Sequence, residues 1–529
     1  MKIPGDFKII TKSNKIFIIL CFNKRYPSFF IGTVIGKETG GLDRLSFVSF
    51  GFLLFFCMIA IAYFLLPHRY RWSWLLAASY FFYMCFNPWY AVFLAVTTLT
   101  TYFAGLRIGS GGRKKMWAVL CLIVNLGILL VFKYLNLFSE WYSQAASLFG
   151  FSFTAAHFDL LLPVGISFYT FQAVSYIIDV YRGDVKPQRH LGKYALFVSF
   201  FPQITSGPIG KSKEMLSQFD EVHSFDETRA KEGFLLMLWG YFEKMVVADR
   251  LGILVDTVYS QPQKYYGLAS LLAVVFYAFQ IYCDFAGYSN ISIGAAKVLG
   301  FRLPVNFNRP YFAKSVQDFW RRWHISLSTW FRDYLYIPLG GNRCSAFRHC
   351  LNIIIVFAVC GFWHGAAVGF LVWGLLHGVY QVVGLLTRNI RVSTRAKLGI
   401  RADSLLCRIW RVTVTFLLTT FAWIFFRAST LADAATVIGS LFRFDPAAFG
   451  DGSVFQLGLS QPEMAVAMAG LLAVFAVDLL SRKRHLIRSI LNFRTPARWA
   501  FYITAALVLV IFGIYGSQYS AQQFIYYQF

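Results

Sequence analysis

Apolar runs of about 20 residues, separated by short polar segments, occupy most of this chain. A helix of that length crosses the roughly 30 Å hydrocarbon core of a bilayer. Segment 194–210 is shorter and contains Pro202, Gly207 and Pro208, which predicts a re-entrant element. Together these segments predict an all-α polytopic membrane protein with about 11–12 spanning or re-entrant helices. The predicted spans lie near residues 45–66, 73–87, 89–106, 116–134, 161–180, 233–257, 267–287, 351–363, 366–387, 409–426, 463–481 and 499–517.

The composition agrees with a membrane protein that contacts lipid along much of its surface. Hydrophobic residues make up 57% of the chain and charged residues only 14%, which is more apolar than a soluble domain. The formal net charge is +25, but the basic residues are scattered over short loops, which argues against a nucleic-acid partner. The nine cysteines lie mostly in apolar runs without metal-ligand spacing, so we predict no metal site.

The loops richest in Lys and Arg predict the orientation, because such loops stay in the cytoplasm. They lie at 107–115, 182–193, 388–411 and 482–498, and one further span then carries the tail, residues 518–529, to the outside. The same count places residue 45 outside, although the preceding residues are basic. Either the count is wrong by one span, or residues 1–44 are an extension from a mis-assigned start codon that precedes a membrane domain at 45–517.

The block from residue 318 to residue 333, DFWRRWHISLSTWFRD, concentrates aromatic and charged side chains around His324. Arginines bind phosphate groups through paired N–H donors, so the block is a candidate site for an anionic donor such as a coenzyme A thioester. Its tryptophans would then anchor it at the membrane interface. The alternative is a solvated cytoplasmic face. The candidate substrate-binding residues are Trp320, Arg321, Arg322, Arg332 and Asp333.

A second histidine, His364, stands in an apolar run between Trp363 and Gly365. A lone histidine in such a run often only bonds a neighbouring helix. Here the nearby glycines leave room for a ligand, and burial favours the neutral imidazole, which can accept a proton. Trp363 is also a candidate for substrate binding, as are Gln280 and Asp284, for which hydrogen bonding between helices is the alternative.

Several blocks resemble the membrane-bound O-acyltransferase family, in its bacterial branch for alginate and peptidoglycan O-acetylation. They span nearly all of the chain from residue 45, and they are LPVGISFYTFQ at 162–172, QIYCDFAGYS at 280–289, the 318–343 block, GFWHG at 361–365 and WIFFR at 423–427. The resemblance implies helices around a central pore, His364 as the catalytic histidine and His324 as a second essential one. It also implies a cytoplasmic acyl-CoA-like thioester as donor substrate, with no bound cofactor.

The last six residues, Phe524-Ile-Tyr-Tyr-Gln-Phe529, are similar to the acyl-carrying tail of a small partner protein in teichoic-acid D-alanylation. The resemblance implies that Tyr526 carries the acyl group transiently. An aromatic belt at the membrane interface is the alternative.

These features predict an enzyme of the bacterial cytoplasmic membrane that moves an acyl group, most simply acetyl, to a cell-envelope polysaccharide. The resemblance implies an extracytoplasmic partner like an SGNH hydrolase, since the chain has no soluble domain for a polymer. One alternative is D-alanyl transfer to teichoic acid. A polysaccharide transporter is another, and it would not depend on His324 or His364.

Overall fold

The computed structural model describes residues 45–151, 158, 162–401, 403–443, 446–481 and 486–515. Within these residues every regular element is a helix and no strand occurs. The predicted all-α fold class is therefore confirmed. The predicted extension 1–44 and the tail that contains Tyr526 lie outside the described residues.

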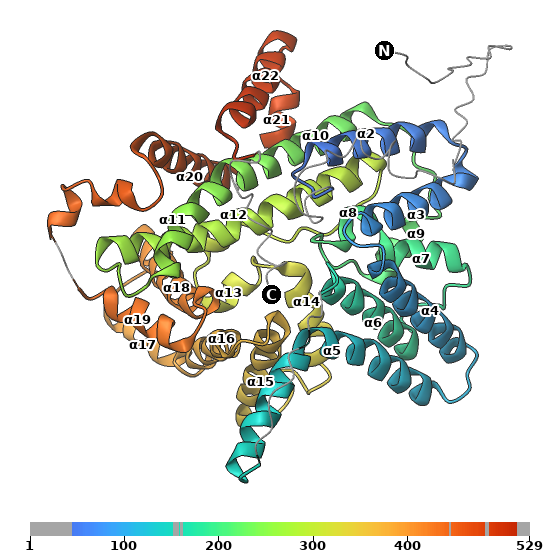
Figure 1. Cartoon of the computed structure of the whole chain (residues 1–529), viewed down its shortest axis with the longest axis horizontal. Coiled ribbons are helices and arrows are strands. Elements are labelled where there is room, and N and C mark those ends of the chain that lie inside the picture. The colour runs from blue at the N-terminus through green and yellow to red at the C-terminus, as the bar shows by residue number, and fades with distance from the viewer. Residues whose placement is uncertain are drawn as a thin grey trace, which may run out of the picture. The chain divides into compact units, whose positions relative to one another are not determined.

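The helices follow one another through short connections (Figure 1). Two π-helices, η1 (Phe242–Ala248) and η3 (Arg332–Tyr336), interrupt the α-helical pattern. The 3₁₀ elements are η2 (Pro310–Phe312), η4 (Pro446–Phe449) and η5 (Ser453–Gln456). The α-helices are α2 (Phe50–Leu65), α3 (His68–Met84), α4 (Tyr90–Gly109), α5 (Lys114–Leu148), α6 (Ile166–Arg182), α7 (Leu191–Ser199), α8 (Phe201–Ile204), α9 (Ser212–Gln218), α10 (Glu227–Tyr241), α11 (Asp249–Ser260), α12 (Leu268–Leu299), α13 (Val316–Trp320), α14 (Ile325–Phe331), α15 (Ala346–His364), α16 (Val368–Leu386), α17 (Arg388–Lys397), α18 (Leu405–Arg427), α19 (Leu431–Ser440), α20 (Gln461–Ser481), α21 (Leu486–Leu491) and α22 (Thr495–Phe512).

Eight of the described helices are long and apolar enough to cross a membrane. They are α4, α5, α12, α15, α16, α18, α20 and α22, and they make the chain a multi-pass membrane protein. Three other predicted spans correspond to shorter helices, since α2 has 16 residues and α3 and α6 have 17 each. The predicted span 233–257 is divided among α10, η1 and α11 and contains the buried charges of Lys244 and Asp249.

One predicted boundary differs from the observed one, and one predicted break is present. Helix α3 begins at His68 rather than near residue 73, because a helix can extend through the charged turn that contains Arg69 and Arg71. Segment 194–210 is broken as predicted. Helix α7 ends at Ser199, and the four-residue helix α8 begins at Phe201 with Pro202 in its first turn.

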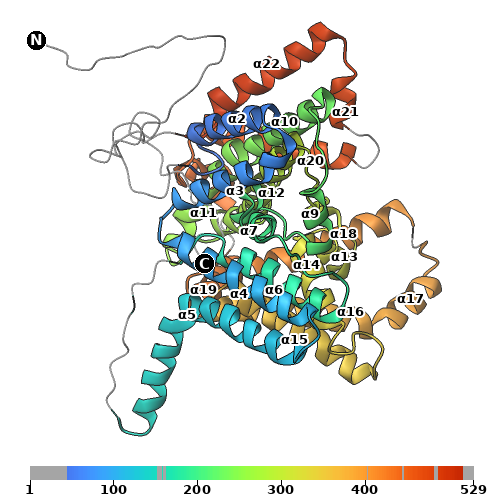
Figure 2. The same ribbon diagram turned by 90° about the vertical axis from the view of Figure 1, so that its right-hand side faces the viewer.

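Helices α10 and α12 lie side by side, and their backbones touch at two pairs of glycines (Figures 1 and 2). A Cβ atom on Gly240 would lie 2.5 Å from the carbonyl oxygen of Gly287. One on Gly233 would lie 2.7 Å from that of Gly294. Both distances are too short for any side chain, so each glycine permits the close approach that stabilises helix pairs in membranes.

Helix α15 packs closely on α16, and α16 packs on α18. Gly361 permits the first contact, since a Cβ atom there would lie 2.4 Å from the carbonyl oxygen of Phe370. Helix α15 ends three residues later, at His364, where Gly365 continues in an extended conformation. This packing holds the last turn of α15 among α5, α6, α16 and α18.

Candidate functional site

His364 is the last residue of α15, and its imidazole is buried. Its Nδ1 atom lies 2.7 Å from the carbonyl oxygen of Cys360, one turn earlier. Because a carbonyl oxygen only accepts hydrogen bonds, Nδ1 must carry the proton. Nε2 of the neutral ring is then the proton acceptor, which is the state that a general base requires.

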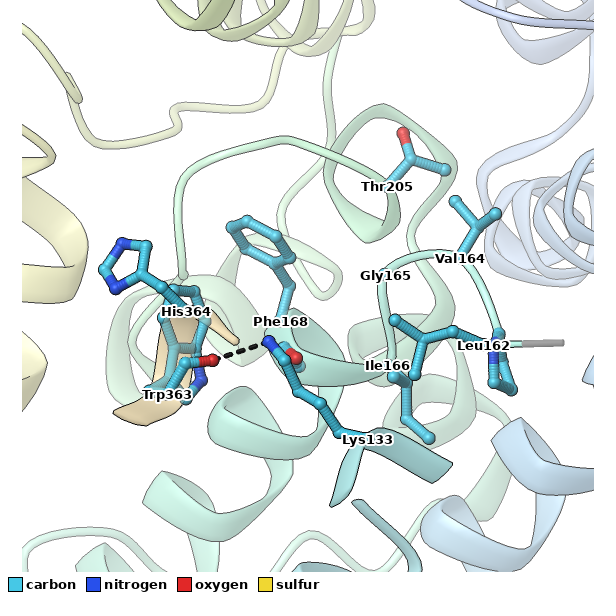
Figure 3. Close-up of a pocket in the computed structure, with 11 residues that line it drawn as sticks. Lys133, Leu162, Val164, Gly165, Ile166, Phe168, Thr205, Trp363 and His364 are labelled. Atoms are coloured by element: carbon cyan, nitrogen blue, oxygen red, sulfur yellow. Dashed lines mark hydrogen bonds between the residues drawn. The ribbon is translucent and has the colours of Figure 1, made fainter. Parts of the chain in front are cut away.

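A small cavity lies beside His364 (Figure 3). Its volume is about 30 Å³, which is room for a water-sized group. Trp363 and Lys133 also line it, together with the turn at 162–165 and the first residues of α6. In Figure 3 the Lys133 side chain reaches from α5 to the Trp363 carbonyl, beside the ring of Phe168.

His324 is held in an unusual backbone conformation at the start of α14. Its φ of 42° and ψ of 54° lie in the left-handed region, which costs of order 1–3 kcal/mol in a residue other than glycine. Buried Asn306 holds the turn, because its backbone oxygen accepts from Ile325 N at 2.9 Å and its Oδ1 accepts from Ser326 Oγ at 2.7 Å. Backbone strain of this kind clusters at functional sites.

Trp363 brings the two predicted histidines into one neighbourhood. Its ring centroid lies 4.9 Å from that of His364 and 6.3 Å from that of His324. The ring of Phe285 packs edge-on against His324 at 4.6 Å. The residues 40 positions apart in the sequence thus share one aromatic environment. No group of three His, Cys, Asp or Glu side chains that could hold a metal ion occurs in the described part of the chain.

Trp320 lies inside the protein rather than at the membrane interface, as does Trp323. The predicted interfacial anchoring of these two rings is therefore wrong. The Trp320 indole donates to Nδ1 of His377 in α16 at 3.2 Å. Trp373 separates His377 from His364, with centroids 5.2 and 4.8 Å away. The sequence analysis missed His377, although it too stands alone in an apolar run.

The charged residues of the 318–343 block pair with one another. Arg322 Nε lies 2.8 Å from Asp318, and Arg332 Nε lies 2.8 Å from Asp333. Asp333 also contacts Lys211 at 2.9 Å. Partial burial opposes ionisation of Asp333, but the hydrogen bonds from Arg332 and Lys211 outweigh it, so the pKa of this carboxyl lies below its ordinary value. Arg321 is exposed, so the surface of the block keeps positive charge.

Gln280 and Asp284 are buried in α12 and are not among the residues that line the cavity. Asp284 Oδ1 lies 2.7 Å from Lys244 Nζ, which also lies 2.6 Å from Asp249 Oδ1. This buried ion triad joins η1, α11 and α12. It gives Asp284 a role in holding helices together that does not require substrate.

Lys133 is the second functional candidate that the sequence analysis missed. It is a single lysine in the apolar run of α5, and this pattern alone marks an intramembrane charge as a functional candidate. Nothing in the sequence around Asn306 marks it as a functional residue. Its importance depends on contacts with a turn about 20 residues away, which only the folded chain shows.

Comparison with known proteins places this geometry in a family. The model of the membrane-bound O-acyltransferase family matches residues 187–430. The chain is 38% identical to the probable alginate O-acetylase AlgI of Pseudomonas aeruginosa, over 75% of each chain. It is 35% identical to the protein of that name from Pseudomonas putida, over 91% of this chain and 100% of the other. It is also 35% identical to the peptidoglycan O-acetyltransferase of Helicobacter pylori, over 74% of this chain and 77% of the other.

These relatives confirm the family that the sequence motifs indicated. They also decide between an enzyme and a transporter, since the family consists of acyltransferases. The chain belongs to the membrane-bound O-acyltransferase family and is a multi-pass membrane acyltransferase.

Proposed function

We propose that this enzyme transfers an acetyl group from a cytoplasmic thioester to a hydroxyl of a cell-envelope polysaccharide, with His364 as the general base. The observation that carries the proposal is the hydrogen bond from His364 Nδ1 to the Cys360 carbonyl oxygen, which makes Nε2 the acceptor nitrogen of a neutral imidazole, in a residue that lines a cavity. The names of the alginate and peptidoglycan relatives support acetyl as the group and an envelope polymer as the acceptor.

The donor is a thioester of the acyl-coenzyme A type, and it approaches the 318–343 block from the cytoplasm. The exposed Arg321 and Arg332 favour anionic phosphates there. His324 of this block and Trp363 beside His364 complete the donor site. Asp284 and Gln280 support it from α12. The membrane is the bacterial cytoplasmic membrane, and an SGNH-hydrolase-like partner outside completes transfer to the polymer.

The acetyl and D-alanyl alternatives differ in charge, because a D-alanyl group carries an ammonium beside its carbonyl. Lys133 places a second ammonium at the cavity beside His364. Two like charges so close repel each other strongly in a partly dry site. The cavity therefore favours an uncharged acyl group.

Purified chain in proteoliposomes tests the proposal directly. With labelled acetyl-coenzyme A on one side and unacetylated alginate or peptidoglycan fragments on the other, we expect release of free thiol and formation of labelled ester. Empty liposomes are the control. If neither thiol nor ester forms with either fragment and the partner protein added, the proposed function is wrong.

Tyr526 is proposed to carry the acetyl group between His364 and the final acceptor. A phenol has an ordinary pKa of about 10 and is a better leaving group than a sugar alkoxide, so its ester stays reactive. We expect Tyr526→Phe to lower polymer acetylation at least about 100-fold, and the neighbouring Tyr527→Phe to change it little. The measurement is ester content of the polymer in cells with equal protein levels. Normal acetylation in Tyr526→Phe would leave the tail with an anchoring role only.

A further inference from the structure

Lys133 is a basic residue inside a membrane-spanning helix, and it lines the same cavity as His364. Its Nζ atom donates a hydrogen bond of 2.6 Å to the carbonyl oxygen of Trp363. That carbonyl belongs to the peptide bond that joins Trp363 to His364. The Lys133 amino group is thus fixed next to the backbone of the proposed base.

The neighbouring residue on α5 helps to fix this position. The Tyr134 hydroxyl donates to the carbonyl oxygen of Phe362, and the two rings stack with centroids 4.2 Å apart. Lys133 Nζ lies 5.5 Å from the Trp363 ring centroid, which adds a cation–π contact. Two successive residues of α5 therefore hold the last turn of α15.

A purely structural explanation is available, because cations stabilise the C-terminal end of a helix. It does not account for the whole arrangement. An ammonium has three N–H donors, and the Trp363 carbonyl uses one. Among the described residues that line the cavity none is acidic, and its volume of about 30 Å³ leaves room for a water-sized group. The site therefore offers a positive charge and hydrogen-bond donors to a single oxygen.

We propose that Lys133 is a catalytic residue that stabilises the oxyanion formed at the thioester carbonyl during acyl transfer. This inference rests on the proposed function, in which His364 is the base. The lysine would also compensate an unfavourable electrostatic feature of the site. The C-terminal end of α15 carries partial negative charge, which opposes an oxyanion beside His364, and the lysine offsets it.

The acceptor oxygen attacks the thioester carbon, its proton passes to Nε2 of His364, and the carbonyl electron pair moves to oxygen beside the Lys133 ammonium. The C–S bond then breaks, the ester carbonyl re-forms, and the leaving thiolate takes the proton from His364. Lys133 remains protonated throughout and transfers no proton.

The first test compares Lys133→Met with Lys133→Arg in the purified full-length chain. Loss of an oxyanion donor should lower kcat about 100-fold with little change in KM, whereas Lys133→Arg, which keeps the charge, should recover part of the loss. An unchanged kcat in Lys133→Met overturns the proposal. His364→Gln is assayed beside it, because an active His364→Gln enzyme would overturn the proposed function independently of Lys133.

The second test starts from the unaltered enzyme. The unaltered enzyme is given isobutyryl and D-alanyl pantetheine thioesters, which match in shape and differ by the ammonium. We expect a preference for isobutyryl of about 100-fold, because the D-alanyl ammonium would lie close to Lys133. In Lys133→Met this preference should shrink, while a structural defect would lower both rates equally. Equal use of the two donors by the unaltered enzyme overturns the inference.

Discussion

Replacement of His364 by alanine is expected to abolish measurable acetyl transfer. General-base catalysis accounts for about 10² to 10⁴ of the rate, and in the proposed function the base is His364, which is buried and lines the cavity. The variant should still insert and fold, since the helix contacts of Gly361 do not involve the imidazole. The measurement is kcat with acetyl-coenzyme A at equal protein levels in the membrane.

His349 provides a matched control on the same helix. It lies in α15 as well, and its Nε2 atom is 3.0 Å from the Tyr336 hydroxyl rather than at the cavity. His349→Ala should therefore keep at least about half of the activity, because this half-buried side chain does not line the cavity. Transfer retained in His364→Ala would show that another group removes the acceptor proton.

The two histidines could be predicted because each departs from its surroundings in the sequence. His364 interrupts an apolar run, and His324 is surrounded by arginines and tryptophans. That Trp363 lies between their rings could not be predicted, since helix packing sets that contact over 40 residues. Lys133 had a signal as clear as that of His364. Its partner, however, is a backbone oxygen 230 residues away, and no local pattern encodes it.

Hydropathy predicted the existence of helices better than their limits. It placed a span at 267–287, whereas α12 continues to Leu299 through twelve further residues that include Lys297. A helix can continue past an apolar run where its polar side chains are paired. Here Lys297 Nζ lies 2.5 Å from a carboxylate oxygen of Glu232. The same reasoning explains α10, η1 and α11. Their charged side chains can be buried because they form ion pairs with one another.

Replacement of Lys244 by methionine is expected to destabilise the protein severely. Its ammonium lies between Asp249 and Asp284, and all three side chains are at most 4% exposed. Removal of the cation leaves two carboxylates close together and out of water, which costs about 3–5 kcal/mol. The midpoint of thermal unfolding in detergent should fall by about 5 °C or more.

Two further variants separate the loss of this triad from the loss of a lysine as such. Lys193→Met removes a cation that pairs with Asp220 at the surface, and surface pairs contribute only about 0–1 kcal/mol, so its midpoint should stay within about 2 °C. The triple variant Lys244→Met, Asp249→Asn, Asp284→Asn removes the charges together and should recover most of the lost stability, because uncharged amides are cheaper to bury than carboxylates. A triple variant as unstable as Lys244→Met would mean that the packing of the lysine chain, and not its charge, joins η1 to α12. An unaltered midpoint in Lys244→Met would show that water reaches the carboxylates and that the triad is not needed for stability.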